Sequence, residues 1–200
     1  MPDHTHGDVQ NQRAARNRPS VPADVIEGVR RRDREALGRF FDLLFPYVYR
    51  LAFRLTGRRE AAEDLTQDVF LKVHRAAESL QTDRDPMPWL TAITCNACRD
   101  ANRRAGARPQ GVAGDEVVDG MSSPAEGPDE VVLRKEREQI VQNALLELDE
   151  TSRMVVILHD YCGMSHEEVA VALQVRADGI RKRYSRGLKR LARIIGSREL

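Results

Sequence analysis

The side chains best suited to chemistry in this chain are basic groups gathered near its C-terminus. Eight Lys and Arg residues and one acidic residue, Asp178, lie between Arg176 and Arg193. Such groups bind DNA phosphates, and Arg also pairs with guanine edges in the major groove. We expect DNA contacts from the residues that fall off the apolar stripe of this segment, namely Arg181, Lys182, Ser185, Arg186 and Lys189.

The residues around this basic segment predict a helix-turn-helix. Ser165 and Glu168 have the spacing of a capping box, so a helix should begin at Ser165. The apolar pattern breaks at about residues 174–177 and resumes with helical spacing from Ile180 to Ile195. A charged helix is most often only a solvated surface, so the DNA-binding interpretation depends on the rest of the chain.

The remainder of the sequence predicts an all-α protein. Apolar residues recur with helical spacing in residues 37–55, 61–80 and 89–104, and no segment alternates as a strand does. Pro46 is expected to kink the first of these helices or to divide it. Residues 105–130 contain six acidic residues, one basic residue, five Gly and three Pro, which predicts a flexible acidic linker.

Two small helical domains are therefore expected on either side of the linker. The predicted segments are a disordered arm (1–23), a helical bundle (24–104), the linker (105–130) and a helix-turn-helix domain (131–196). The net charge of +1 combines two mildly basic domains with the acidic linker. No apolar run approaches the roughly 20 residues that span a membrane, so no membrane insertion is expected. The three Cys residues, an odd and small number, fit a reducing cytoplasm.

The order of these segments resembles the extracytoplasmic-function sigma factors, the smallest class of bacterial sigma-70-type initiation factors. The resemblance covers about residues 23–195. It rests on AEDLTQDVFLKVHR (62–75), WLTAITCNACRDANRR (89–104) and the helix-turn-helix within 145–191. It implies a subunit that is not itself an enzyme and has no cofactor. The first domain would read and open the −10 element of a promoter, and the second would read the −35 element.

The resemblance also implies partners and contact residues. Core RNA polymerase and promoter DNA are the expected partners, and sigma factors of this class are commonly held inactive by an anti-sigma factor. The −10 contacts are expected from one helix, at Trp89, Asn96, Arg99, Arg103 and Arg104. The core polymerase is expected on the polar side of the preceding helix, at Asp64, Gln67, Asp68 and Lys72.

Two segments depart from the family pattern. Pro86 and Pro88 stand in the loop that, in the family, captures a flipped base, where an aromatic and a small polar residue are common. The recognition helix begins Asp178-Gly179-Ile180 in place of Gly-Thr-Val, and Asp178 would repel phosphates. The acidic linker is expected either to occupy basic surface along the RNA path of the polymerase or only to add solubility.

Other interpretations have weaker support in the sequence. A stand-alone helix-turn-helix regulator would need a dimer surface and a ligand domain, which residues 24–104 do not suggest. A protein-interaction module that mimics a sigma domain would have no use for the basic helix. No nucleophile motif or phosphate-binding loop is present. Metal or redox roles are not expected for the two loose clusters, Cys95 with Cys98 and His159 with Cys162 and His166.

Overall fold

The structure is a computed structural model that describes residues 18–105 and 127–197, and within these ranges every regular element is helical. The first half contains α2 (Ala23–Arg30), α3 (Arg34–Thr56), α4 (Arg59–Ala76), the 3-10 turn η1 (Ala77–Ser79) and α5 (Met87–Ala105). The second half contains α6 (Pro128–Leu146), α7 (Glu150–Val156), the π-helical segment η2 (Ile157–Tyr161), α8 (His166–Leu173) and α9 (Ala177–Gly196). The all-α prediction is confirmed. Most of the predicted arm and linker lies outside the described residues.

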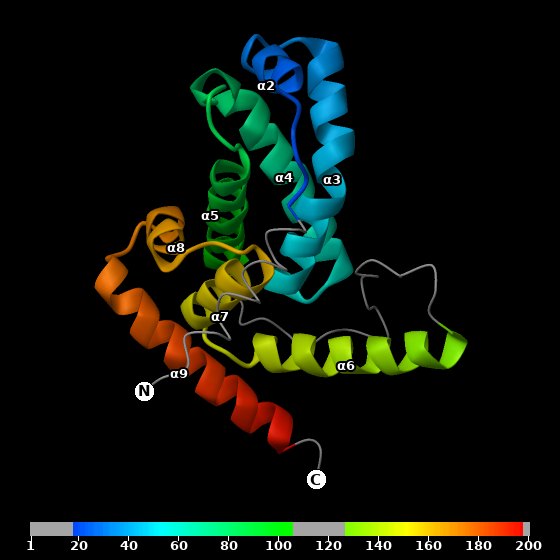
Figure 1. Cartoon of the computed structure of the whole chain (residues 1–200), viewed down its shortest axis with the longest axis vertical. Helices are drawn as coiled ribbons and strands as arrows, with labels where there is room; N and C mark the ends of the chain where they lie inside the picture. The colour runs from blue at the N-terminus through cyan, green and yellow to red at the C-terminus, as the bar shows by residue number, and fades with distance from the viewer. Residues whose placement is uncertain (1–17, 106–126, 198–200) are drawn as a thin grey trace.

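Helix α3 packs against α2, α4 and α5 in the first half, and α4 lies between α3 and α5 in Figure 1. The carboxylate of Asp33 caps the N-terminus of α3 by accepting a hydrogen bond from Ala36 N at 2.8 Å. Gly57 ends it in the left-handed conformation, with φ of 71°, which favours glycine. The apolar stripe expected from the sequence is buried along its length, at Phe40, Leu44, Val48, Leu51 and Leu55.

Two features of this half differ from the sequence analysis. Helix α3 continues through Pro46 as one element, so the division considered there does not occur. Helix α2 was not predicted, and residue 23 was assigned to the arm. Its eight residues bury Val25, Ile26 and Val29, but this is too short a segment for apolar periodicity to identify a helix.

The second half places a compact three-helix unit beside the long helix α6. The predicted capping box is present, because Ser165 Oγ accepts from Glu168 N at 3.1 Å and the Glu168 carboxylate accepts from Ser165 N at 2.7 Å. Helix α8 ends at Leu173, and the next residue, Gln174, adopts the left-handed conformation with φ of 55°. This geometry turns the chain directly into α9.

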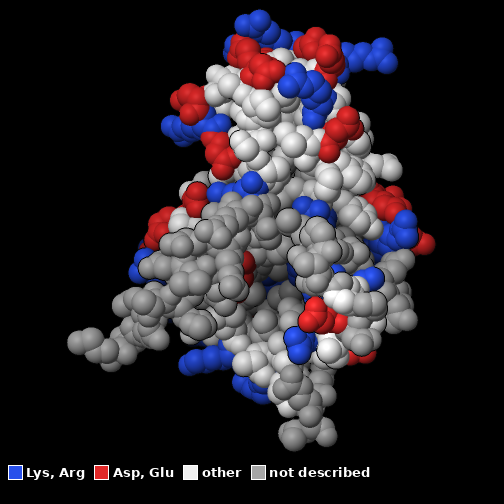
Figure 2. All heavy atoms as spheres, turned by 45° about the vertical axis from the view of Figure 1, so that its right-hand side comes forward, with Lys and Arg blue, Asp and Glu red and all other residues white. Residues whose placement is uncertain are grey.

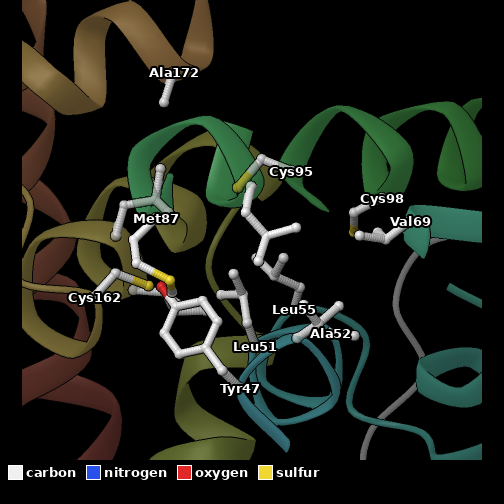
Figure 3. Close-up of a cluster of buried hydrophobic side chains, with 14 of the residues drawn as sticks. Tyr47, Leu51, Ala52, Leu55, Val69, Met87, Cys95, Cys98, Cys162 and Ala172 are labelled. Carbon is white, nitrogen blue, oxygen red and sulfur yellow. The ribbon is translucent and has the colours of Figure 1, made fainter. Parts of the chain in front are cut away.

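The two halves pack against each other and share one apolar core. Helix α8 lies against α5, and α6 runs past the end of α3 (Figure 1). Figure 3 shows the core at this boundary, where Tyr47, Met87, Cys162 and Ala172 point toward one another from both halves. The Tyr47 hydroxyl also lies 3.0 Å from Thr91 Oγ1. The sequence analysis predicted two helical domains but not this shared core.

Candidate nucleic-acid interface and partner surfaces

The predicted DNA-contacting face of α9 is exposed along the helix. Ile180 is buried on the opposite side, and Tyr184, Leu188 and Leu191 are partly buried there. Gly187 lets α9 approach α7 closely, because a Cβ at this position would lie 3.0 Å from Val156 Cγ2. The packing of α9 therefore turns the predicted contact residues toward solvent, and all of them are exposed: Arg181, Lys182, Ser185, Arg186 and Lys189.

The basic surface of α9 extends beyond the predicted set. A groove of about 480 Å³ lies between the start of α7 and α9, and Arg183 and Arg190 line it together with Lys182 and Arg186. These two arginines belong to the eight bases between Arg176 and Arg193, but their spacing alone does not single them out. Only their position beside α7 distinguishes them, and the apolar spacing alone does not reveal that position.

Acidic neighbours lie at the N-terminal end of this basic surface. The Arg181 guanidinium lies 3.3 Å from the Glu167 carboxylate of α8, and Arg176 lies 3.2 Å from Asp178. All four side chains are well exposed, so these ion pairs are weak and a DNA phosphate can replace the carboxylates.

A polar cluster beneath α9 fixes its orientation. The Tyr184 hydroxyl donates to the Asp160 carboxylate at 2.6 Å. His159 stacks on His166 with ring centroids 4.3 Å apart, and both rings meet Tyr184 edge-on. Burial raises the pKa of Asp160, although the bond from Tyr184 acts in the opposite direction. The cluster connects η2, α8 and α9.

The predicted −10 residues of α5 do not share one environment. Arg103 and Arg104 are exposed, at 3.3 Å from Asp100 and from Asp68 respectively. Arg99 instead faces the second half and donates to the backbone carbonyl of Leu173 at 3.0 Å. Asn96 is partly buried on the same helix.

Asp100 is the central ion-pair partner on this side of α5. Lys72 lies 3.0 Å from its carboxylate, and that hydrogen bond is the main reason that its pKa is lowered. Arg103 also lies 3.3 Å from the Asp100 carboxylate. Asp100 thus joins a predicted −10 residue to a predicted polymerase-contacting residue.

Trp89 lies at the boundary between the two halves. It is partly buried and lines a groove of about 670 Å³ together with Pro86 and Pro88. The opposite wall comes from the second half and includes Met164 and Val171, whose side chain is 79% exposed. The structure therefore places the predicted base-capturing loop against α8.

The predicted polymerase-contacting residues are divided between two environments on α4. Asp64 and Gln67 are exposed, whereas Asp68 and Lys72 form ion pairs with α5. At the neighbouring end of the molecule, over α2 and the start of α3, basic and acidic side chains are intermixed (Figure 2). Neither surface has the basic excess seen on α9.

An aromatic patch beside α4 was missed by the sequence analysis. We define it as Phe41, Phe45, Phe70 and Leu71, which have partly or fully exposed side chains on α3 and α4. The ring centroids of Phe41 and Phe70 are 4.6 Å apart, and those of Phe41 and Phe45 are 5.2 Å apart. The spacing of Phe41 and Phe45 by four residues was the available signal. A contiguous exposed apolar patch of this kind indicates a protein-binding surface.

The cysteines belong to the core in this structure. Cys95, Cys98 and Cys162 are free and buried, and burial raises the pKa of Cys98 to about 12 and that of Cys162 to about 11. Within residues 18–105 and 127–197, no three His, Cys, Asp or Glu side chains are grouped as a metal site requires. Among the helices described, none is both long and apolar enough to cross a membrane.

Comparison with known families matches both halves of the chain. Residues 40–108 match the model of Sigma-70 region 2, and residues 138–191 match that of Sigma-70 region 4. The chain is 34% identical over 168 residues to the ECF RNA polymerase sigma factor SigM of Mycobacterium tuberculosis, which covers 82% of this chain and 79% of SigM. It is 35% identical over 144 residues to the ECF RNA polymerase sigma factor SigE of Mycolicibacterium smegmatis, which covers 72% of this chain and 55% of SigE.

Two solved structures have a similar fold. CnrH, in complex with the cytosolic domain of CnrY, has a TM-score of 0.61 at 21% identity, covering 88% of this chain and 97% of CnrH. The sigma factor RpoE, in complex with the anti-sigma factor NepR from Bartonella quintana, has a TM-score of 0.58 at 23% identity, covering 80% of this chain and 96% of RpoE. At these levels of identity, the two structures show only that this chain has a similar fold.

Proposed function

The chain belongs to the extracytoplasmic-function sigma factors of the sigma-70 family, and from this premise we propose that it binds core RNA polymerase and directs initiation at specific promoters. It supplies recognition and strand opening, while the bond-forming chemistry of transcription belongs to the polymerase. The observation that carries the proposal is the exposed basic face of α9, oriented by a capped α8 and by the Tyr184–Asp160 hydrogen bond. Its place of action would be the cytoplasm, where the polymerase works.

The recognition of the −35 element is assigned to α9. Arg181, Lys182, Ser185 and Arg186 would read base edges and phosphates, and Lys189 would contact the backbone. Arg183 and Arg190 extend the basic surface toward α7 and would bind phosphates along the same groove. Phosphate contacts position the protein, whereas base contacts set its sequence preference.

The −10 element is assigned to α5 and the loop before it. Arg103 and Arg104 are exposed, so a phosphate can replace the carboxylates of Asp100 and Asp68 that lie beside them. Trp89 and Arg99 would follow once the second half moves away from them, because Arg99 donates to the Leu173 carbonyl and Trp89 shares a groove with α8. Asn96, which is partly buried on the same helix, is assigned to the same element.

The core polymerase is assigned to α4 and the aromatic patch. Asp64 and Gln67 would supply polar contacts beside Phe41, Phe45 and Phe70. Interfaces with a central aromatic cluster and a polar rim are typical of protein partners. An anti-sigma factor is a further proposed partner, because the structural relatives CnrH and RpoE are seen with CnrY and with the anti-sigma factor NepR.

Run-off transcription tests this function directly. Purified core polymerase, this protein and a pool of genomic fragments from its source should give new transcripts that share paired upstream elements. The double variant Arg181→Ala with Arg186→Ala should lose these transcripts, whereas Arg137→Ala, which removes an exposed base from α6, should retain them.

The alternatives predict different outcomes in the same experiment. DNA binding without polymerase and without any transcript would indicate a stand-alone regulator. Neither DNA binding nor transcription would indicate an interaction module. Transcription that survives the double variant would exclude α9 as the −35 reader.

A further inference from the structure

The first turn of α9 carries an acidic residue on a strongly basic helix. Asp178 is the only acidic residue between Ala177 and Gly196, where the other charged residues are all Lys or Arg. A carboxylate repels phosphates, so its presence on a DNA-binding helix lowers the affinity for every DNA sequence. Asp178 therefore needs either a structural role or a partner in DNA that a basic side chain cannot bind.

Capping of the helix does not explain Asp178. The N-cap residue of α9 is Arg176, and within the described residues no side chain accepts a hydrogen bond from the amides at this helix start. The Asp178 carboxylate accepts from the Arg176 guanidinium at 3.2 Å, and the two side chains are 80% and 91% exposed. An ion pair this exposed adds little stability, and solvent also weakens the interaction of Asp178 with the helix dipole.

Asp178 shares the helix face that is assigned to the −35 bases. Residues three, four and seven positions further along an α-helix lie on the same side, and here these are Arg181, Lys182 and Ser185. The groove assigned to phosphates lies next to this face, and its lining includes Gly179 but not Asp178. Asp178 therefore belongs to the base-contacting side of α9.

The start of α9 is open to an approaching DNA duplex. Residues 174–179 are all exposed, and a Cβ added at Gly179 would meet no atom within 4 Å. In helix-turn-helix proteins, the N-terminal residues of the recognition helix contact base edges in the major groove. The first turn of α9, which contains Asp178, can therefore approach the base pairs closely.

We propose that Asp178 is a specificity-determining residue that accepts a hydrogen bond from the N4 amino group of a cytosine in the −35 element. This inference rests on the proposed function, because it adds a base contact to the same helix. In the major groove, only cytosine and adenine present amino donors, whereas guanine and thymine present acceptors. Adenine also presents the N7 acceptor, to which an ionised carboxylate cannot donate, so cytosine is the better partner.

The ion pair with Arg176 is compatible with this contact. An ionised carboxylate has about four acceptor sites, so the Asp178 side chain can bind Arg176 and a cytosine together. The positive charge of Arg176 also offsets the repulsion between Asp178 and the phosphates as the helix approaches DNA. The acid thus retains its ability to select a base, while its effect on the overall affinity is reduced.

The test measures base preference with the holoenzyme formed from core polymerase and the full chain. The promoter found by run-off is randomised over its −35 element, and each sequence is linked to a barcode in the transcript. The wild type should prefer cytosine at one position, on one of the two strands. Asp178→Ala should reduce this preference about tenfold and leave the other positions unchanged. Asp178→Asn should change it to adenine, because an amide pairs with adenine N6 and N7.

A matched control separates base contact from net charge. Glu167→Gln removes another exposed acidic charge beside α9 and should keep the preference for cytosine. Circular dichroism verifies the helical content of each variant. An unchanged preference in folded Asp178→Ala would overturn the proposal, and so would an equal loss of the preference in Glu167→Gln.

Failure of the proposed function would look different. In that case the wild-type holoenzyme gives no transcript, and a pool of random duplexes is used for binding selection on the protein alone. A selected cytosine that Asp178→Ala no longer selects would support the base contact without a sigma factor function. The absence of any selected sequence would overturn both proposals.

Discussion

Arginine side chains in this protein serve two kinds of partner. Those of α9 are exposed and surrounded by other bases, whereas Arg99 and Arg153 donate to backbone carbonyls at the boundary between the halves. The sequence predicted the first kind because their spacing relative to an apolar stripe is visible. It could not predict the second kind, because every residue has a backbone carbonyl. The sequence therefore does not indicate which carbonyl accepts the hydrogen bond of a given arginine.

Two basic residues of α9, Arg186 and Lys189, should contribute differently to DNA binding: the first to sequence selectivity and the second to overall affinity. We expect Arg186→Ala to reduce binding to the cognate −35 element by about 1–3 kcal/mol and to relax its selectivity, because a bidentate Arg–guanine pair discriminates between bases. Lys189→Ala should weaken binding to every sequence alike. Competition binding with cognate and scrambled duplexes measures both. Equal losses on the two duplexes for Arg186→Ala would contradict the assignment.

The histidine cluster beneath α9 should make stability depend on pH. Burial lowers the pKa of His166 below its usual value of 6.5, and the charges of His159 and Arg181 act in the same direction. As pH falls, the unfolded chain therefore takes up this proton before the folded protein does. The free energy of unfolding should be greatest above about pH 6.5, decrease as pH falls through that value, and level off below the folded-state pKa.

Denaturant unfolding between about pH 7.5 and pH 5 measures this dependence. The variant His166→Gln removes the titrating group and keeps a polar side chain at the start of α8. Its stability should change less with pH than that of the wild type. Identical slopes for the two proteins would show that His166 does not contribute.

At the scale of single elements, the helices with capping signals were the most predictable. The box at Ser165 and Glu168 located the start of α8, and the apolar stripe over residues 37–55 located α3, which ends at Thr56. Helix α2 has neither a side-chain cap nor enough length, and α3 retains its form across Pro46 because its long stripe is buried on both sides of that residue. Tertiary packing determines both the formation of α2 and the continuity of α3, and this packing cannot be read from the sequence.

The capping box of α8 should contribute measurably to stability. Ser165→Ala leaves the Glu168 amide without its acceptor, and we expect a loss of about 0.5–2 kcal/mol in the free energy of unfolding. Ser185→Ala replaces an exposed serine within α9 and serves as the control, with no loss of stability expected. Chemical denaturation of both variants measures the difference. A cost equal to that of the control would mean that the cap is dispensable.

At the scale of the whole molecule, Gly57 lies where the end of α3 in the first half contacts α6 in the second half. Gly57 has a positive φ, and a Cβ there would collide with the Leu146 side chain of α6. Gly57→Ala should therefore destabilise the protein by roughly 1–2 kcal/mol from backbone strain alone, and more from the collision. Gly38→Ala, which meets no atom within 4 Å, should cost nothing.

A double variant separates the two effects. Leu146→Ala removes the collision but not the strain, so the two substitutions together should cost less than the sum of their separate effects. Additive costs, measured by denaturant unfolding, would show that the halves do not meet at this point in solution.

The sulfur atom of Cys162 lies near the hydroxyl group of Tyr47 at the boundary of the halves, and both residues are buried (Figure 3). The thiolate is the reactive form, and burial keeps the pKa of this thiol at about 11, so the closed protein should resist alkylation at neutral pH. Each separation of the halves returns the thiol to water and to its ordinary reactivity. The rate at which iodoacetamide modifies Cys162 therefore reports how often the boundary between the halves opens, and the native chain carries its own kinetic probe of that motion.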